Sequence, residues 1–302
     1  MKKITIIIIV IAILGIGGYF LSRISVKQNV VENQNVATTT PPTNNEPPAV
    51  VKDTTKTVIG KSVEGRDIIA YHYGGGGTEI LFVGGIHGGY EWNTVLVAYE
   101  LMGYLQQKQS PSAVPANVKV TVIPVLNPDG LYKTVGTTAI FTQADVPASQ
   151  EKQVSGRFNA NNVDLNRNFD CDWQAEGKWQ NKTVSGGSSA FSEPESQAFK
   201  NYVETNKPVA VVVWYSSANG VFASSCHNGV SSETNTITKK YADASGYPAY
   251  QSFNFYEITG DMVNWLAKNN IPAISVLLTN HTDTEWTKNR AGIEAILKYY
   301  AK

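Results

Sequence analysis

The chain has 302 residues, of which 25 are acidic and 25 are basic, so its formal net charge is zero. This balance argues against nucleic acid or an anionic membrane surface as the main partner. Hydrophobic residues make up 42% of the chain, enough to build a sizeable core.

The first residues carry a targeting signal. Lys2 and Lys3 precede an apolar run from Ile4 to Leu21, close to the roughly 20 residues that span a bilayer. The lysines favour an N-terminus on the inner side. Residues 1–23 therefore predict a transmembrane signal anchor in the cell membrane, with the C-terminal part outside. Cleavage of a signal peptide, giving a secreted protein, is the alternative, although no Ala-x-Ala-like site follows Leu21.

Residues 24–56 are rich in Asn, Thr, Val and Pro and show neither a helix nor a strand period. This composition predicts a disordered linker. Residues 57–302 remain as one domain of ordinary size.

Strands and helices alternate along this domain. Continuous apolar runs predict buried strands, and apolar residues at helical spacing predict helices. The predicted strands cover 57–59, 67–73, 79–83, 118–125, 209–214 and 274–278, and the predicted helices cover 92–107, 193–204, 260–268 and 289–300. Ser192 and Glu195 match a capping box at the second helix, and residues 134–160 are interpreted as a polar excursion.

This order predicts an α/β fold with a mixed, mainly parallel sheet and helices on both faces. The chain has two cysteines, Cys171 and Cys226. In an oxidising compartment they are candidates for one disulfide. Two independent buried thiols are the alternative.

Chemistry-bearing residues follow the strand over 79–83. In such sheets, ligands bind at the carboxyl ends of strands. His87 comes just after this end, behind two glycines, and Glu91 follows four residues later. A neutral imidazole nitrogen and a carboxylate oxygen both suit Zn²⁺. A turn-capping His and a Glu that favours a helix N-terminus form the structural alternative.

A second group of polar residues lies between Arg157 and Asn168, where Asn166 and Arg167 adjoin. The guanidinium group of Arg matches a carboxylate, and an adjacent Asn can donate a further hydrogen bond. Taken alone, the segment is interpreted as a structural polar loop rather than as a binding site.

The ordered set of motifs resembles the carboxypeptidase A-like zinc metallopeptidases over essentially the whole of 57–300. The matching segments are Ile59–Arg66, Gly85-Ile86-His87 with Glu91, Asn127–Gly130, Val163–Asn168 and Phe191–Glu195. The resemblance implies that His87 and Glu91 bind zinc and that Asn166 and Arg167 hold a peptide's C-terminal carboxylate. It also implies that Arg157 polarises the scissile carbonyl, that Tyr256 closes over substrate, and that Val263 lies near the specificity pocket.

Three departures from the family pattern are visible. Glu91 comes one residue later than the family's His-x-x-Glu spacing. Tyr215 occupies the position of the third ligand, a His, and neutral Tyr is a poor zinc ligand. Leu277 or Leu278 occupies the position of the catalytic Glu. His281, and less favourably His227, are candidate substitute ligands, with a surface histidine as the alternative for each.

Two functions follow from these residues. The first is a zinc-dependent metallocarboxypeptidase that releases C-terminal residues from peptides, with peptidoglycan stem peptides as one substrate class. The second is an inactive carboxypeptidase-like domain that binds peptide C-termini. A purely structural envelope module would leave the Asn-Arg-Asn segment unexplained.

Overall fold

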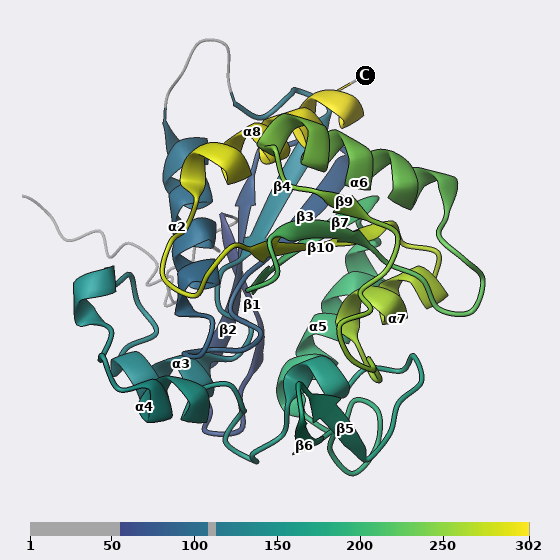
Figure 1. Cartoon of the computed structure of the whole chain (residues 1–302). Helices are drawn as coiled ribbons and strands as arrows, with labels where there is room; N and C mark the ends of the chain where they lie inside the picture. The colour runs from purple at the N-terminus through teal and green to yellow at the C-terminus, as the bar shows by residue number, and fades with distance from the viewer. Residues whose placement is uncertain (1–54, 108–112, 302) are drawn as a thin grey trace, which may run out of the picture. The chain divides into compact units, whose positions relative to one another are not determined.

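Figure 1 shows the computed structural model, which describes residues 55–107 and 113–301. The predicted anchor at 1–23 and the predicted linker, apart from its last two residues, lie outside the described part. The linker prediction ends too late, because strand β1 already begins at Lys56. Within the described ranges, no helix is both long and apolar enough to cross a bilayer.

One eight-stranded sheet organises the domain, in the order β1-β2-β4-β3-β7-β10-β8-β9. The strands are β1 (Lys56–Lys61), β2 (Asp67–Tyr73), β3 (Thr78–Val83), β4 (Val118–Ile123), β7 (Ala210–Ser216), β8 (Gly220–Ala223), β9 (Ala249–Tyr250) and β10 (Ala273–Leu278). Four of its seven strand pairings are parallel, and three are antiparallel. The predicted mixed α/β sheet is therefore confirmed.

Helices cover both faces of the sheet (Figure 1). Helices α2 (Trp92–Gln106), α6 (Ser232–Ser245) and α8 (Trp286–Tyr300) share one core with the sheet. Helices α5 (Pro194–Asn206) and α7 (Met262–Lys268) share a second core on the opposite face. Because side chains alternate along a strand, each central strand supplies both cores.

Strand β7 illustrates this alternation. Val212 and Trp214 belong to the core with α2, α6 and α8, whereas Val213 and Tyr215 belong to the core with α5 and α7. A strand buried on both faces is nearly all apolar, which explains why the sequence pattern located β3, β7 and β10 to within one or two residues.

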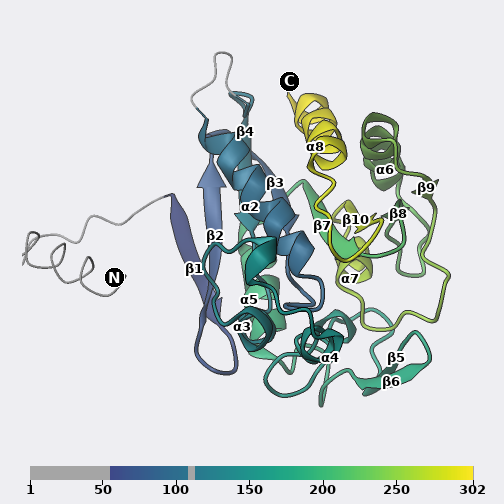
Figure 2. The same ribbon diagram turned by 60° about the vertical axis from the view of Figure 1, so that its left-hand side comes forward.

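Several elements were not anticipated. The predicted excursion at 134–160 contains the end of α3 (Pro128–Val135), the short helix η1 (Gln143–Asp145) and α4 (Gln150–Ser155). Helix α6 was missed, and so was a separate hairpin of β5 (Glu176–Trp179) and β6 (Lys182–Ser185), which lies apart from the main sheet (Figure 2). A further short helix, η2, covers Leu165–Arg167.

The predicted capping box at α5 is wrong. Glu193, not Ser192, is the N-cap, and its side chain makes no cap hydrogen bond. Ser192 Oγ instead donates to Glu193 Oε1. The Glu195 carboxylate accepts from Val63 N and from Asn159 Nδ2. Tertiary contacts therefore take the groups that a local capping box would use.

Cys171 and Cys226 form a disulfide, with 6.2 Å between their Cα atoms. The predicted pairing is thus present. It ties the segment after η2 to the segment after β8, 55 residues further along the chain.

Replacing Phe82 with Ala tests the core between the sheet and helices α2, α6 and α8. Phe82 has no exposed surface and stacks on Trp214 at 5.6 Å between ring centroids. We expect Phe82→Ala to lower the free energy of unfolding by about 3–5 kcal/mol, through lost burial and a residual cavity. Urea denaturation measures the change. Val58→Ala is the control, because Val58 is 52% exposed. An equal loss of unfolding free energy in both variants would contradict the assignment of Phe82 to the buried core.

Candidate active site

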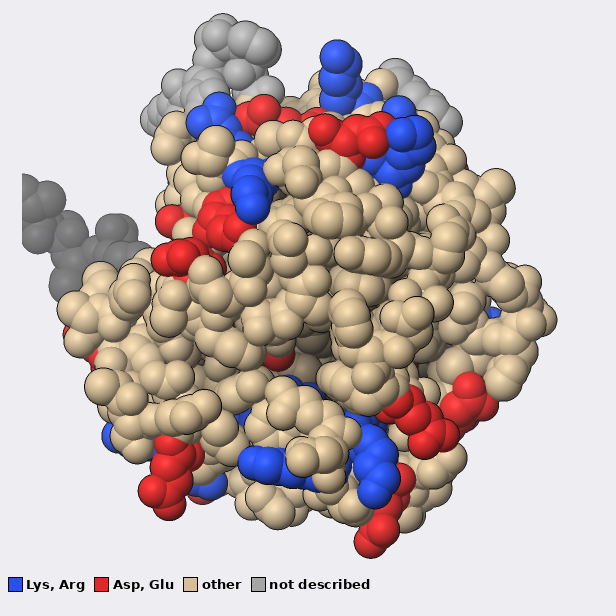
Figure 3. Space-filling model, in the orientation of Figure 1, with Lys and Arg blue, Asp and Glu red and all other residues tan. Residues whose placement is uncertain are grey.

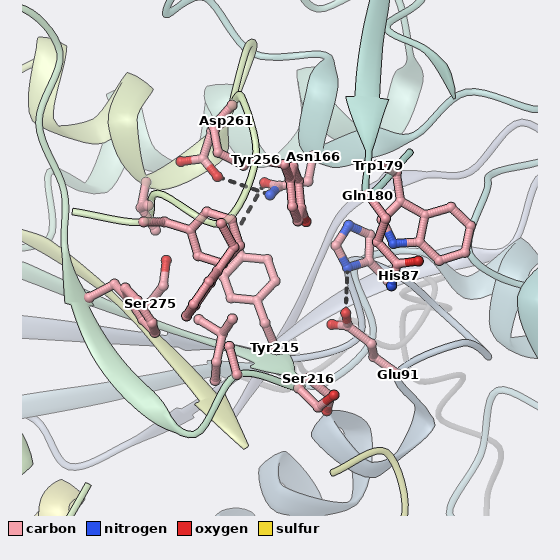
Figure 4. Close-up of a pocket in the computed structure, with 18 of the residues that line it drawn as sticks. His87, Glu91, Asn166, Trp179, Gln180, Tyr215, Ser216, Tyr256, Asp261 and Ser275 are labelled. Carbon is pink, nitrogen blue, oxygen red and sulfur yellow. Dashed lines mark hydrogen bonds and ion pairs between the residues drawn. The ribbon is translucent and has the colours of Figure 1, made fainter. Parts of the chain in front are cut away.

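A cavity of about 550 Å³ opens at the carboxyl ends of β3, β7 and β10. Its lining comes from distant parts of the chain, including the turn after β3, the β5–β6 hairpin, the segment before α7 and the loop after β10. Figure 4 shows His87 and Glu91 on one side of the pocket and Asp261 and Ser275 on the other, with Tyr215 between them.

A tight turn positions His87 and Glu91. Gly85 and Gly88 both have positive φ, at 62° and 44°, a conformation that glycine adopts without strain. The turn brings His87 Nδ1 to 3.0 Å from Glu91 Oε1. Both side chains are buried and line the cavity. The extra residue between them therefore does not keep the two candidate ligands apart.

Arg157 and Asp164 form a buried ion pair behind this turn. Arg157 Nη2 and Nε lie 2.8 and 3.0 Å from Asp164 Oδ2. Asp164 Oδ1 is 3.3 Å from His87 Nε2. Burial by itself raises the pKa of Asp164, but Arg157 and His87 outweigh burial and hold that pKa far below its ordinary value. The carboxylate therefore stays ionised and fixes both neighbours.

The guanidinium group of Arg157 also faces the cavity. It lies over the Trp179 ring at 4.4 Å from the centroid, and its Nη1 is 3.8 Å from Glu91 Oε1. This cation therefore lies beside the two candidate metal ligands, where the family resemblance requires a carbonyl-polarising group.

Tyr215 is buried at the end of β7, with its ring 5.7 Å from the His87 ring. Its hydroxyl donates to Asn166 Oδ1 at 3.2 Å, and Asn166 Nδ2 donates to Asp261 Oδ2 at 2.9 Å. Burial raises the pKa of Tyr215 well above its usual value. The phenol is therefore neutral and donates its proton to Asn166, and a neutral phenol oxygen is a poor zinc ligand.

Leu277 lies directly beside Tyr215, because the two residues are Cα partners in the parallel pairing of β10 with β7. Leu277 lines the cavity, whereas Leu278 belongs to the core on the other face of the sheet. Leu277 is thus the residue at the position of the family's catalytic Glu. It offers no group that can accept a proton.

The remaining predicted residues divide between the pocket and the protein interior. Asn166, Tyr256, Val263 and His281 line the cavity, but Arg167 does not. The guanidinium group of Arg167 donates to the carbonyl oxygens of Lys178 and Asn166. The structure thus does not bring it to the cavity as a free carboxylate clamp.

Of the two substitute ligands, His227 lies at the surface, with its side chain 71% exposed and paired with Asp172. His281 packs against Tyr90 at 4.6 Å between ring centroids. Burial lowers the pKa of His281, which favours the neutral ring that a metal requires.

The described residues fit a family-type zinc site only in part. The two nitrogens of His87, Glu91 Oε2 and His281 Nδ1 are buried without hydrogen-bond partners. The short approaches of His87 to Glu91 and Asp164 lie within ion-pair distance but lack hydrogen-bond angles. These free atoms favour a metal ligand role for His87 and Glu91.

Among the described residues, no third ligand joins His87 and Glu91. In the described part of the chain, the one group of three His, Cys, Asp or Glu side chains close enough to share an ion is Cys171, Asp172 and Cys226. The disulfide occupies both of those cysteines. Catalytic zinc sites use three protein ligands, so His87, Glu91 and His281 as placed do not form one.

Sequence reasoning missed three residues of the site. Asp164 lies within the Asn-Arg motif, but its acidic side chain received no role. Trp179 lies in the unpredicted β5–β6 hairpin. Asp261 is the N-cap of α7 and accepts from Asn264 N. Asp261 lies inside the predicted helix at 260–268, but Asp is a favoured N-cap residue, and assigning it that role would have moved the predicted start to 262.

The chain belongs to the zinc carboxypeptidase family, whose profile matches residues 49–295. The predicted family is thereby confirmed.

Among curated relatives, a metallocarboxypeptidase A-like protein of Trichophyton verrucosum is 29% identical over 154 residues, which is 48% of this chain and 34% of that protein. Gamma-D-glutamyl-L-diamino acid endopeptidase 1 of Lysinibacillus sphaericus is 23% identical over 218 residues, covering 66% of this chain and 54% of that protein. The chain thus spans between a third and about half of these relatives.

Among solved structures, murein-tripeptide amidase from Escherichia coli O157 is similar with a TM-score of 0.58 and 20% identity. The match covers 82% of this chain and 93% of the amidase. Bovine thrombin-activatable fibrinolysis inhibitor is similar with a TM-score of 0.63 and 18% identity, covering 81% of this chain and 87% of that one. At these identities the likeness establishes the fold.

Asp164→Asn tests whether the buried carboxylate holds the site together. Removing one partner of a buried ion pair leaves the other charge uncompensated, so we expect a loss of about 3–5 kcal/mol in unfolding free energy at neutral pH. A carboxylate with a depressed pKa contributes stability above its unfolded pKa of about 4, and this contribution is lost as the pH falls. The advantage of the wild type should therefore shrink as the pH drops from about 5 towards about 2.

Denaturant unfolding at several pH values measures this difference. Asp170→Asn is the matched control, because Asp170 pairs with Lys268 at the exposed surface, where ion pairs contribute little. A difference between wild type and Asp164→Asn that does not change with pH would contradict the assigned role.

Proposed function

We propose that the cavity binds the C-terminal end of a peptide and that the domain is a carboxypeptidase-type hydrolase of such peptides. The observation that carries this proposal is the meeting of His87, Glu91 and Arg157 at one wall of the cavity. Membership of the zinc carboxypeptidase family supports the reaction class. Arg157 is the cation available to a carbonyl or carboxylate oxygen, since Arg167 is bound to main-chain carbonyls.

Peptidoglycan stem peptides are the substrate class that we favour. Two similar proteins are a murein-tripeptide amidase and a gamma-D-glutamyl-L-diamino acid endopeptidase. The predicted anchor at 1–23 would place the domain outside the membrane, where such peptides occur. Trp179 and Tyr256 provide aromatic walls for a peptide in the cavity.

Binding without hydrolysis is the second candidate function, and two observations favour it. Tyr215 replaces the third ligand and donates its proton to Asn166. Leu277 lies beside it at the position of the general base. Loss of a general base costs about 10²–10⁴ in rate. These two substitutions favour slow turnover, or binding alone, over rapid hydrolysis.

The amount of zinc bound per chain distinguishes the two candidate functions. We expect the purified full-length protein, reconstituted with zinc and dialysed, to retain well under one zinc per chain, because two candidate ligands, and no third, converge within the described ranges. Tyr215→His should raise retention towards one zinc, whereas Tyr215→Phe, which preserves the ring without adding a ligand, should not. Elemental analysis measures the metal. One zinc per wild-type chain, lost in His87→Ala, would instead establish a complete metal site.

Hydrolysis is tested with peptides ending in Phe, Lys or D-Ala, with mass spectrometry detecting the released residue. We expect the wild type to bind peptide but to release residues at least about 100-fold more slowly than Tyr215→His combined with Leu277→Glu, which restores both a ligand and a base. Leu277→Met is the control for a change of side chain without a base. Rapid release by the wild type would favour the hydrolase, and failure of every peptide to bind would contradict both candidates.

A further inference from the structure

Two short segments beside the cavity share one pattern, a cysteine followed by a residue that can bind a metal. They are Cys171-Asp172, after η2, and Cys226-His227, after β8. Figure 3 shows the hollow at the centre of one face where the cavity opens, and Ser225, which adjoins Cys226, belongs to the cavity lining. The proposed peptide-binding function gives neither Asp172 nor His227 a role.

The disulfide already holds the two sulfur atoms together. The Cα atoms of Cys171 and Cys226 are 6.2 Å apart, and both residues are buried. With Zn–S bonds of about 2.3 Å, a tetrahedral zinc ion separates two thiolate sulfurs by about 3.8 Å. Rotation of the two cysteine side chains gives this separation while the backbone stays in place.

The carboxylate of Asp172 completes a group of three ligand atoms. One ligand atom each from Cys171, Asp172 and Cys226 lie within 4.8 Å of one another, and Asp172 Oδ2 is 3.8 Å from Cys171 Sγ. Thiolate sulfur and carboxylate oxygen both bind Zn²⁺. Reduction of the disulfide therefore leaves three protein ligands around one point.

His227 provides the fourth ligand atom. Its Nε2 lies 2.8 Å from Asp172 Oδ1. Both residues have positive φ, 54° for Asp172 and 64° for His227, a conformation that is uncommon outside glycine. Their side chains are 51% and 71% exposed. An ion can therefore enter from solvent on this side, and the imidazole can turn from the carboxylate to the ion.

We propose that these four side chains form a zinc site that becomes available when a dithiol reductant opens the disulfide. Two electrons from the reductant break the S–S bond, its two thiols become a disulfide, and their two protons pass to the cysteine sulfurs. Zn²⁺ then displaces these protons, because the thiolate and not the thiol is the metal ligand. Two thiolates, a carboxylate and an imidazole supply the four ligands of a tetrahedral site.

This zinc site shares no residue with the turn that carries His87 and Glu91. In an oxidising compartment the disulfide keeps the site closed. The soft thiolate ligands give the opened site a preference for Zn²⁺ over Mg²⁺ or Ca²⁺. The metal replaces the disulfide as the link between the segment after η2 and the segment after β8, so the cavity wall at Ser225 stays braced in the reduced chain.

Zinc uptake by the full-length protein tests the inference. One portion is treated with a phosphine reductant, which opens the disulfide without offering thiols to zinc, and the other stays oxidised. Both are equilibrated with zinc and dialysed without oxygen before elemental analysis. We expect the reduced protein to hold one zinc per chain more than the oxidised protein, and the same difference in His87→Ala. Cobalt in place of zinc should give a sulfur-to-cobalt charge-transfer absorption in the reduced protein alone.

Asp172→Asn and His227→Ala change exposed side chains of the proposed site. Loss of a group that merely orients a ligand already costs about 10–100-fold in metal affinity, so each variant should lower the zinc affinity of the reduced protein at least about tenfold. Asp170→Asn is the matched control, because Asp170 is an acid two residues away that pairs with Lys268 at the exposed surface. It should leave the zinc affinity unchanged.

Zinc should also raise the melting temperature of the reduced protein and not that of the oxidised protein, because a ligand that binds only the folded state stabilises it. No zinc gained on reduction, or a gain that survives both Asp172→Asn and His227→Ala, would overturn the inference. A reduced chain that unfolds and does not refold with zinc would overturn it as well. None of these outcomes changes the proposed peptide-binding function, which depends on the cavity residues.

Discussion

The alternation of side chains in three adjacent parallel strands determines what the cavity contains. Strands β3, β7 and β10 are buried on both faces, so every residue is assigned to one face or the other. A slip of one residue would move an entire strand's side chains to the opposite core. That constraint places Tyr215 and Leu277 side by side on the face that carries the cavity. Two of the three departures from the family pattern, Tyr215 and Leu277, therefore lie at the same place in the cavity wall.

The polar part of the site depends on a different kind of support. Asp164 is buried and accepts from Arg157 and from the backbone N–H of Asn166, while lying close to His87. It therefore connects the turn after β3 with the segment of η2. A buried carboxylate in this position fixes geometry more than it adds stability. The carboxylate also lies 3.3 Å from His87 Nε2, so its negative charge is next to the imidazole ring in the cavity wall.

The sequence located the parts of the molecule whose structure is decided locally. Continuous apolar runs predicted the central strands, and the order of motifs predicted the family. Helix α6 was missed because it is rich in Thr, Ser and Lys and turns few apolar side chains, such as Ile237 and Tyr241, toward the core. Its signals were present in Ser231, which caps the helix, and in Gly246, which ends it with positive φ.

The contacts of Arg167 could not be read from the sequence, because its acceptor at Lys178 belongs to a hairpin formed elsewhere in the chain. The same holds for Ser192 and Glu195, whose local pattern gave way to contacts with distant groups. Local patterns predict which groups are available. Tertiary structure decides which partner each group takes. A family motif therefore predicts which residues are present at a site, but not all of the contacts that they make.

A chain of hydrogen bonds orders the polar side chains on one wall of this pocket. Tyr215 donates to Asn166, and Asn166 donates to Asp261. Met262 N also donates to Asn166 Oδ1, so the amide is held from both sides. Satisfied buried networks rigidify a site. Tyr215 and Met262 N together therefore orient Asn166, which in turn contacts the Asp261 carboxylate. The residue at the position where the family resemblance implies a third zinc ligand is thus part of the hydrogen-bonded wall of the cavity.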